Sequence, residues 1–262
     1  MSPALQTTLR RLAVLGIASV IALALWALFL WAFDISPLIG KYPWDVLAYL
    51  TTVDGAAEHR ALLWDGLGIT VRDAGVGYVV GLAFAFALAV LFSVSPVLER
   101  IVMPTAMVLR SIPLIVLTPL ITLIFGIGLS GVTAIVLLVV FLPSLANILY
   151  GLRSVSAEQR DLVQAYGGNA WTLLRKVALP TAVPAALASA RIAIPAAMTG
   201  AMIGEWLSTG EGLGGSISRA AGSFDYGHMW AAAVAITAVT MIAYAVVSIV
   251  DALVVDRLGA RA

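Results

Sequence analysis

The sequence predicts an all-α integral membrane protein, on the evidence of its composition and of the length of its apolar runs. Hydrophobic residues make up 61% of the 262 residues and charged residues only 11%, with a mean hydropathy of +1.03. An ordinary soluble domain carries about 25% charged residues. A soluble core of this size could not bury so many apolar side chains, whereas lipid solvates them directly. Because an open sheet edge cannot be satisfied in lipid, the spans should be helices.

Six transmembrane helices are predicted, since about 20 apolar residues of helix cross the hydrocarbon core. We expect them to belong to one transmembrane domain covering residues 1–262. The first apolar run has 22 residues, longer than the hydrophobic region of a secretory signal, so it is interpreted as a retained span. The predicted spans are Leu12–Phe33, Gly75–Val94, Val102–Phe125, Val132–Leu152, Ala185–Glu205 and Met229–Val250.

The distribution of Lys and Arg predicts that both termini are cytoplasmic, because cations favour the inner side of a membrane. Outer segments are then expected at residues 34–73 and 207–228, and one sizeable cytoplasmic loop at residues 153–184. The nine cations of the inner segments are Arg10, Arg11, Arg100, Arg153, Arg160, Arg175, Lys176, Arg257 and Arg261, against Lys41, Arg60 and Arg219 in the outer segments.

Several chemistries are excluded or disfavoured. The chain has no cysteine, and its two histidines, His59 and His228, are far apart without a ligand-type spacing, so no metal site is expected. A net charge of +1 without a basic patch gives no indication of a nucleic-acid partner. The two lysines, Lys41 and Lys176, do not lie in a phosphate-binding loop, and no catalytic cluster is present. ATP hydrolysis and other catalysis are therefore not expected in this chain.

The cytoplasmic loop contains the signals of a helix, a turn and a second helix. Ser156 and Gln159 form a capping-box pattern that predicts a helix starting at Ala157. Gly167 and Gly168 should end that helix, because glycine readily adopts the left-handed conformation. Asn169 is a good N-cap for a helix running from Ala170 toward Leu179, and Pro180 and Pro184 should interrupt its continuation into the next span.

One face of the first loop helix mixes an acid with small and apolar residues, Glu158, Leu162 and Ala165. Such a surface could dock into a groove of a soluble partner. It could equally lie on the membrane interface.

Three polar or helix-breaking residues within or at the ends of predicted spans are candidates for a functional site. Arg110 lies in an apolar run, just before Pro113, where a cation either lines a pathway or snorkels to the inner surface. Pro113 could loosen the backbone around a gate. Glu205 ends the fifth predicted span beside Trp206, where it either contacts a substrate or gate residue or anchors the helix at the interface.

The loop resembles a motif of the permease subunits of ATP-binding-cassette (ABC) importers, EAA-x3-G-x9-I-x-LP. Gly167 matches its glycine, Val177 its isoleucine, and Leu179 and Pro180 its end, while Asp161, Leu162 and Val163 stand in place of EAA. Similarity to the nitrate, sulfonate and taurine branch extends over LRSIPLIVLTPLITLIFGIG, YGGNAWTLLRKVALPTAVPAAL and GEWLSTGEGLG.

The resemblance implies a type I ABC importer transmembrane domain, with this chain as one half of a permease dimer, either a homodimer or a heterodimer. Its implied partners are a dimer of ATP-binding subunits, which would hold the ATP and Mg²⁺, a solute-binding protein and the lipid membrane. The implied coupling residues are Glu158, Asp161, Leu162, Ala165, Gly167 and Gly168, and the implied docking residues for the binding protein are Glu211, Gly212 and Gly214.

The predicted function is thus to form the pathway for a small polar or anionic solute, such as nitrate, a sulfonate, taurine or a pyrimidine precursor. An ion-coupled secondary transporter or channel is the alternative. It would be expected to have more ionisable groups inside its spans and often related halves, which this sequence lacks. A membrane-embedded enzyme or scaffold is a third class, and the absence of a catalytic cluster disfavours an enzyme.

Overall fold

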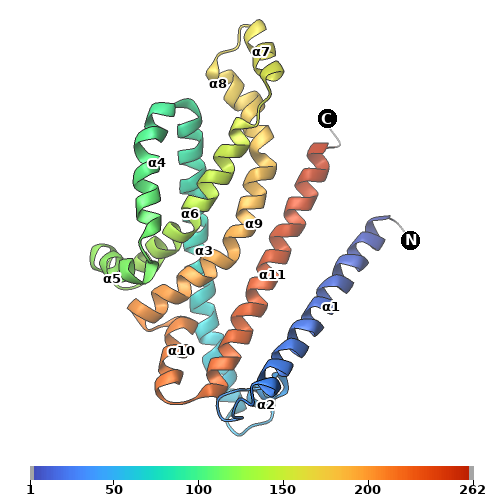
Figure 1. The fold of residues 1–262 in the computed structure, drawn as a ribbon, viewed down its shortest axis with the longest axis vertical. Helices are drawn as coiled ribbons and strands as arrows, with labels where there is room; N and C mark the ends of the chain where they lie inside the picture. Colours follow the sequence, from blue (N-terminus) through green and yellow to red (C-terminus); the bar gives the residue numbers. More distant parts are fainter. Residues whose placement is uncertain (1–2, 260–262) are drawn as a thin grey trace. The chain divides into compact units, whose positions relative to one another are not determined.

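The structure is a computed structural model that describes residues 3–259, with side chains described for residues 16–256. Within that part of the chain the secondary structure is entirely helical (Figure 1). Four of the cations from which the orientation is predicted, Arg10, Arg11, Arg257 and Arg261, lie outside the described side chains. The helices are α1 (Pro3–Ala32), α2 (Pro43–Thr51), α3 (Ala56–Val94), α4 (Pro96–Ser111), α5 (Leu114–Phe125), α6 (Leu129–Arg153), α7 (Ala157–Ala165), α8 (Ala170–Leu173), η1 (Leu174–Ala178), α9 (Leu179–Gly204), η2 (Glu205–Thr209), α10 (Gly212–Gly222) and α11 (Tyr226–Gly259), where η marks a π-helix.

The chain divides into two compact units. Unit 1 comprises Met1–Trp64 and Arg219–Ala233, and unit 2 comprises Asp65–Ser218 and Val234–Ala262. Helices α3, α10 and α11 each contribute residues to both units.

Unit 1 is held together by aromatic stacking and polar contacts. Trp26 of α1 stacks on Trp230 of α11 at 5.0 Å between ring centroids, and the indole N–H of Trp230 donates to the carbonyl of Ile39 at 2.8 Å. The ring of Tyr49 in α2 stacks on His59 at 4.0 Å, and its hydroxyl donates to Asp225 Oδ2 at 3.1 Å. Contacts between residues far apart in the sequence therefore hold the short helix α2 in place.

The core of unit 2 lies between α3, α6 and α9, where small residues allow close approach of the helices. A Cβ on Gly151 of α6 would lie 2.6 Å from Ala185 Cβ in α9, and a Cβ on Gly200 of α9 would lie 3.3 Å from Val136 Cα in α6. Small residues at such crossings are typical of helices that pack in membranes. A second set of apolar side chains fills the end of this core toward α8; its fully or almost fully buried members include Phe92, Leu145, Ile148, Leu149 and Ala182.

Four helices are long and apolar enough to cross a membrane, and a fifth span results if the bent pair α4 and α5 is counted as one. Within the described side chains, α1 contributes a shorter apolar segment, Gly16–Ala32. An all-helical membrane protein is therefore confirmed, while the count of six spans stays a prediction.

The third predicted span, Val102–Phe125, is not one helix. Its two halves, α4 and α5, meet at an angle of 111° at Ile112 and Pro113. Ile112 is extended, with φ −79° and ψ 126°, because the ring of a following proline disfavours the helical conformation. Pro113 therefore separates two helices, while its predicted role at a gate stays a prediction.

Pro180 and Pro184 do not end the helix, because Ala170–Thr209 forms one helical span of 40 residues, but the continuation is not a regular α-helix, since the π turn η1 lies directly before α9. Pro180 lies in the first turn of α9, directly after the π turn η1. A proline lacks the N–H and its ring clashes with the carbonyl four residues earlier in a regular α-helix. The wider i→i+5 turn changes the register at this point and accommodates it.

The segment 207–228 is also more ordered than a simple loop. It contains the end of η2, all of α10 and the start of α11. Helix α3 likewise begins at Ala56, well before the predicted span at Gly75.

Candidate functional site: the α7–α8 segment, the α4–α5 bend and the start of α10

The helix, turn and helix predicted within residues 153–184 are confirmed. The hydroxyl of Ser156 accepts from the N–H of Gln159 at 3.3 Å, and the Gln159 side chain accepts from the N–H of Ser156 at 3.2 Å, which starts α7 at Ala157. Gly167 follows with φ +73°, and the side chain of Asn169 accepts from the N–H of Thr172 at 3.0 Å to start α8. Reciprocal capping of this kind explains why a helix of nine residues forms on the surface.

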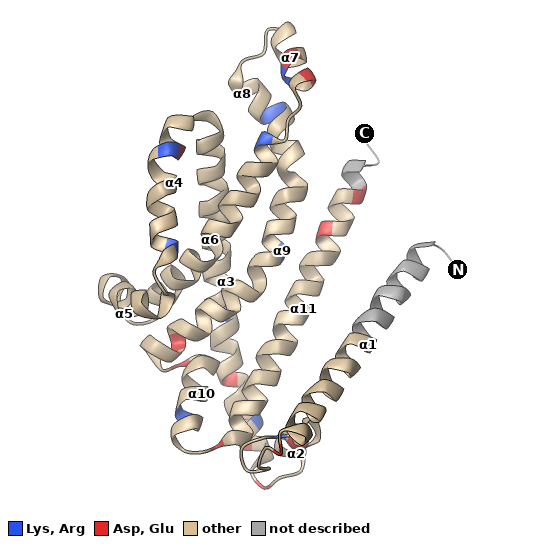
Figure 2. Ribbon diagram, in the orientation of Figure 1, with Lys and Arg blue, Asp and Glu red and all other residues tan. Residues whose placement is uncertain are grey.

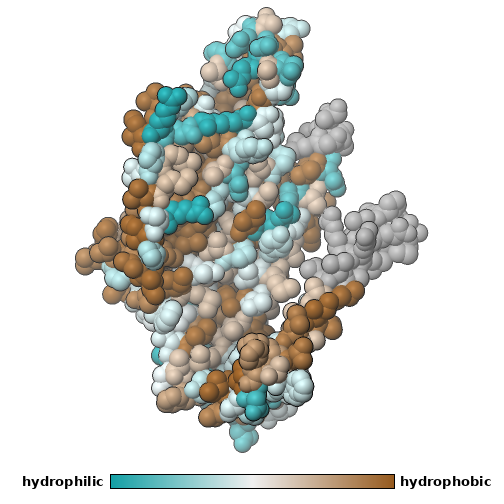
Figure 3. All heavy atoms as spheres, viewed as in Figure 1, coloured by the Kyte–Doolittle hydropathy of each residue, from teal (hydrophilic) through white to brown (hydrophobic). Residues whose placement is uncertain are grey.

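The α7–α8 segment is almost entirely exposed. No residue of α7 is buried, and Leu162, Tyr166 and Trp171 expose 60%, 86% and 61% of their surface. Figure 3 shows this end of unit 2 as mainly hydrophilic, and Figure 2 shows charges of both signs on it. The hydrogen bond from the Ser156 side chain, together with a backbone bond, lowers the pKa of Glu158, so α7 presents an ionised acid at its first turn.

The six predicted coupling residues lie together on this segment. Gly168 is half-buried against Val163, where a Cβ would lie 2.8 Å from the Val163 carbonyl oxygen. The other five, Glu158, Asp161, Leu162, Ala165 and Gly167, are exposed.

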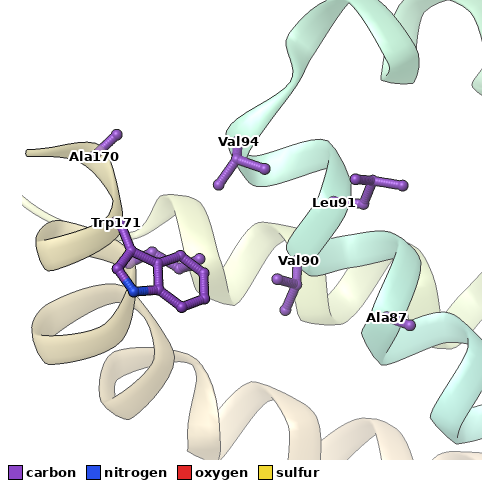
Figure 4. A pocket seen from close by; sticks show the side chains of 7 residues that line it. Ala87, Val90, Leu91, Val94, Ala170 and Trp171 are labelled. Atoms are coloured by element: carbon purple, nitrogen blue, oxygen red, sulfur yellow. The ribbon is translucent and has the colours of Figure 1, made fainter.

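Helix α8 passes into the membrane-spanning part of α9 without a loop. Leu174 and Ala178 of η1 are buried against the α3–α6–α9 core, so α8 is joined to packed side chains by continuous helix. Beside this connection lies an apolar pocket of about 540 Å³ between the end of α3 and α8, lined by Val90, Leu91, Val94 and Trp171, with Ala87, Ala170 and Leu174 (Figure 4).

The α4–α5 bend exposes Arg110 in the last turn of α4. Arg110 has no ion-pair partner among the described side chains. Beyond Pro113, α5 exposes a broad apolar surface, shown brown in Figure 3. Its most exposed large residues are Leu123, Ile124 and Val116, and Ile127 follows the helix.

Glu205 is fully buried rather than exposed to a pathway. Its Oε2 accepts from the Thr70 hydroxyl at 2.8 Å and from the N–H of Gly214 at 2.9 Å. Gly212 and Gly214, predicted to contact a binding protein, are also buried, and a Cβ on Gly212 would overlap the Glu205 carboxyl group. Of the predicted docking residues, only Glu211 is exposed.

The sequence analysis missed Thr70, the hydrogen-bond partner of Glu205, and the ion pair between Asp251 and Arg191. Thr70 lies in an apolar stretch of α3, and no local pattern marks it as the partner of a residue 135 positions later. Asp251 of α11 pairs with Arg191 at 3.3 Å, which gives that intramembrane cation a partner. Asp251 directly follows the predicted span Met229–Val250, whereas Arg191 lies inside the predicted span Ala185–Glu205, where a cation usually has a partner.

The comparisons with known proteins agree with this architecture. Residues 77–260 match the family model described as "Binding-protein-dependent transport system inner membrane component". A Haemophilus influenzae protein described as "Probable ABC transporter permease protein" is 30% identical over 71% of this chain and 76% of its own length. The riboflavin transport permease RibX of Chloroflexus aurantiacus is 32% identical over 60% of this chain and 59% of its own, and the taurine transport permease TauC of Escherichia coli is 27% identical over 72% and 69%.

Among solved structures, an inward-facing MetNI methionine ABC transporter has a similar fold. Its chain aligns with a TM-score of 0.57 at 20% identity, covering 76% of this chain and 95% of that one. ATP hydrolysis in such transporters takes place in a separate ATPase subunit. The membrane-spanning helices, the surface segment α7–α8 and the match over residues 77–260 together place this chain in the family of binding-protein-dependent transport system inner membrane components, the permease subunits of ABC importers.

Proposed function

We propose that the α7–α8 segment is the surface through which an ATP-binding subunit moves the transmembrane helices of this permease. The observation that carries the proposal is the unbroken helical connection from α8 through η1 into α9, with Leu174 and Ala178 packed in the unit 2 core. A displacement applied to α8 cannot be absorbed by a flexible loop. It must tilt or shift α9, and alternate tilting of packed helices is one way to open a pathway to each side in turn.

The exposed face of α7 is suited to a protein partner. Leu162 and Tyr166 would gain from burial in a groove, while Glu158 and Asp161 can pair with cations around its rim. Gly167 turns the chain sharply enough to bring α8 back beneath α7, and Gly168 allows close contact with Val163. We propose the same six residues as the coupling surface: Glu158, Asp161, Leu162, Ala165, Gly167 and Gly168.

The translocation pathway is proposed to form between two copies of this chain, near the α4–α5 bend. Large side chains of α5 that are exposed in one copy would be covered by the second, and Arg110 and Pro113 at the bend would lie at a gate. An exposed cation at this position favours a small polar or anionic solute, the class to which taurine and the aliphatic sulfonates of two relatives belong.

The proposed orientation places both termini and α7–α8 in the cytoplasm. The start of α10, at the opposite end of unit 2 from α7 (Figure 1), and the exposed Glu211 directly before it then face the solute-binding protein. Gly212 and Gly214 support that surface from within, since both are buried around Glu205.

Co-expression with an ATP-binding subunit, followed by reconstitution in liposomes, tests the proposal. We expect the two proteins to co-purify and solute uptake to require ATP and a binding protein. Two copies carrying different affinity tags should also purify together if the dimer is a homodimer. Uptake driven by a proton or sodium gradient without ATP would instead identify an ion-coupled transporter, and would refute the proposed coupling role of α7–α8.

A further inference from the structure

A buried polar cluster joins three helices of unit 2 at the start of α10. It consists of Thr70 of α3, Glu205 at the start of η2, and Leu213 and Gly214 in the first turn of α10; we call these four residues the α10 clamp. Thr70, Glu205 and Leu213 have no solvent exposure at all. Buried polar groups need internal partners, because each unmet hydrogen bond is costly. Glu205 Oε2 has two such partners, whereas Glu205 Oε1 is buried without one in the described part of the structure.

The clamp caps α10 from outside its own segment. The N–H of Leu213 donates to Thr70 Oγ1 at 2.9 Å, and the N–H of Gly214 donates to Glu205 Oε2 at 2.9 Å. The Thr70 hydroxyl in turn donates to the same Oε2 at 2.8 Å. The first N–H groups of a helix usually find a local N-cap side chain. Here two other helices supply the acceptors, so the position of α10 is tied to α3 and η2.

Two glycines, Gly66 and Gly214, allow α10 to lie close to the neighbouring helices. Gly66 lies against the Leu213 side chain, where a Cβ would approach it to 3.1 Å, and a Cβ on Gly214 would overlap the carbonyl oxygen of Met202. Side chains larger than hydrogen at these positions would separate α10 from the two helices that cap it. The clamp therefore depends on contact at backbone distance as well as on hydrogen bonds.

Directly before the clamp, the chain makes a sharp turn that carries Glu211. Gly210 and Gly212 both have positive φ, +68° and +63°, and the N–H of Glu211 donates to Thr209 Oγ1 at 3.1 Å. Glu211 is exposed, between residues that are held on both sides. Such a turn can present one carboxylate in a fixed position, which lowers the entropy lost when a partner binds it.

We infer that Glu205 and Thr70 are positioning residues for the transport cycle: they hold the start of α10 so that Glu211 meets a basic side chain of the solute-binding protein. This inference rests on the proposed function, which places the α10 end on the outer side. In this inference Glu205 does not touch the solute, whereas the sequence analysis considered a contact between Glu205 and a substrate or gate residue.

The test uses the complete transporter, with its ATPase, reconstituted in lipid nanodiscs and titrated with binding protein. The measured quantities are the basal ATPase rate and the binding-protein concentration that gives half of the maximal stimulation. For Thr70→Val we expect that concentration to rise about tenfold, because two hydrogen bonds that order α10 are lost. The basal rate should stay within about twofold of the wild type. Thr70→Ser, which keeps the hydroxyl, should restore the wild-type value.

Thr240→Val is the matched control, because the Thr240 hydroxyl donates only to Ile236 of its own helix, at 2.6 Å. It should change neither quantity. A wild-type half-stimulating concentration for Thr70→Val would overturn the inference and leave the clamp a purely structural feature.

Glu211→Lys keeps the inference testable if Thr70→Val fails to assemble, since residue 211 is exposed. Reversing its charge should raise the half-stimulating concentration, and an unchanged concentration would overturn the inference. If no binding protein stimulates the wild-type transporter, the proposed function itself is overturned. The wild type is measured first, so this outcome is distinguished from a failure of the inference alone.

Discussion

Replacing Gly167 with leucine gives a direct measure of how much the turn between α7 and α8 contributes to transport. Gly167 has φ +73°, and a Cβ added there would have no neighbour within 4 Å. The cost of Gly167→Leu is therefore conformational rather than steric. A left-handed backbone costs a residue with a Cβ about 1–2 kcal/mol.

A cost of that size lowers the population of the correctly turned segment by a factor of about 5–30. If this turn presents α7 to the ATPase, the initial rate of ATP-driven uptake should fall by a similar factor while the protein still inserts in the membrane. The assay is uptake by liposomes that contain the co-purified complex at a matched protein content. Gly167→Asn should lose much less activity, because asparagine tolerates the left-handed conformation.

Gly75→Leu provides the matched control for this experiment. Gly75 is an exposed glycine within α3, where an added Cβ would likewise have no neighbour within 4 Å, but its backbone is that of a regular helix. The same substitution there should leave uptake unchanged. Normal uptake by Gly167→Leu, or equal losses in the leucine and asparagine variants, would refute the reasoning.

Two further predictions concern the stability of each unit. Gly151→Ala should lower the thermal unfolding midpoint in detergent, because the new methyl group would lie 2.6 Å from Ala185 Cβ and overpacking costs about 1–3 kcal/mol; Ala185→Gly in the same chain should recover part of the loss. In unit 1, the pKa of Tyr49 is raised, mainly by burial of its side chain and further by the charge and the hydrogen bond of Asp225. The folded state therefore favours the neutral phenol, so this contribution to stability is complete below about pH 10 and is lost as the pH rises through the raised pKa. Tyr49→Phe should remove that alkaline dependence of the unfolding midpoint. Because Tyr49 should still be neutral near pH 10, the variant and the wild type should show the same tyrosinate absorbance there. A smaller absorbance from the variant would show that Tyr49 titrates normally.

The membrane class and the structure of the α7–α8 segment could be predicted because their determinants are local. Long apolar runs exclude a soluble fold wherever they lie in the chain. The Ser156–Gln159 capping box, the turn at Gly167 and the N-cap Asn169 each depend on residues within about one helical turn. Neighbouring residues alone therefore determine where these helices begin and end.

The effect of each proline could not be predicted in the same way. Pro113 follows an extended residue and separates α4 from α5, whereas Pro143, Pro184 and Pro195 lie inside continuous helices. A proline within a helix costs about 3 kcal/mol or more, and whether the helix continues depends on the packing that offsets this cost. At Pro180 a π turn accommodates the ring, and the residues around that turn are buried against α3 and α6.

The sequence by itself determined that this chain crosses a membrane as helices and carries a capped helical segment between two spans, because hydropathy and capping act over short distances. Only the tertiary structure decided the role of Glu205. Its partner Thr70 lies 135 residues away, and the N–H of Gly214 reaches it through a turn between two left-handed glycines. A carboxylate at the end of an apolar run is equally compatible with an interface, a pathway or a buried cluster. The folded chain selects the buried cluster, because only there are the hydroxyl and N–H donors within hydrogen-bonding distance of Oε2.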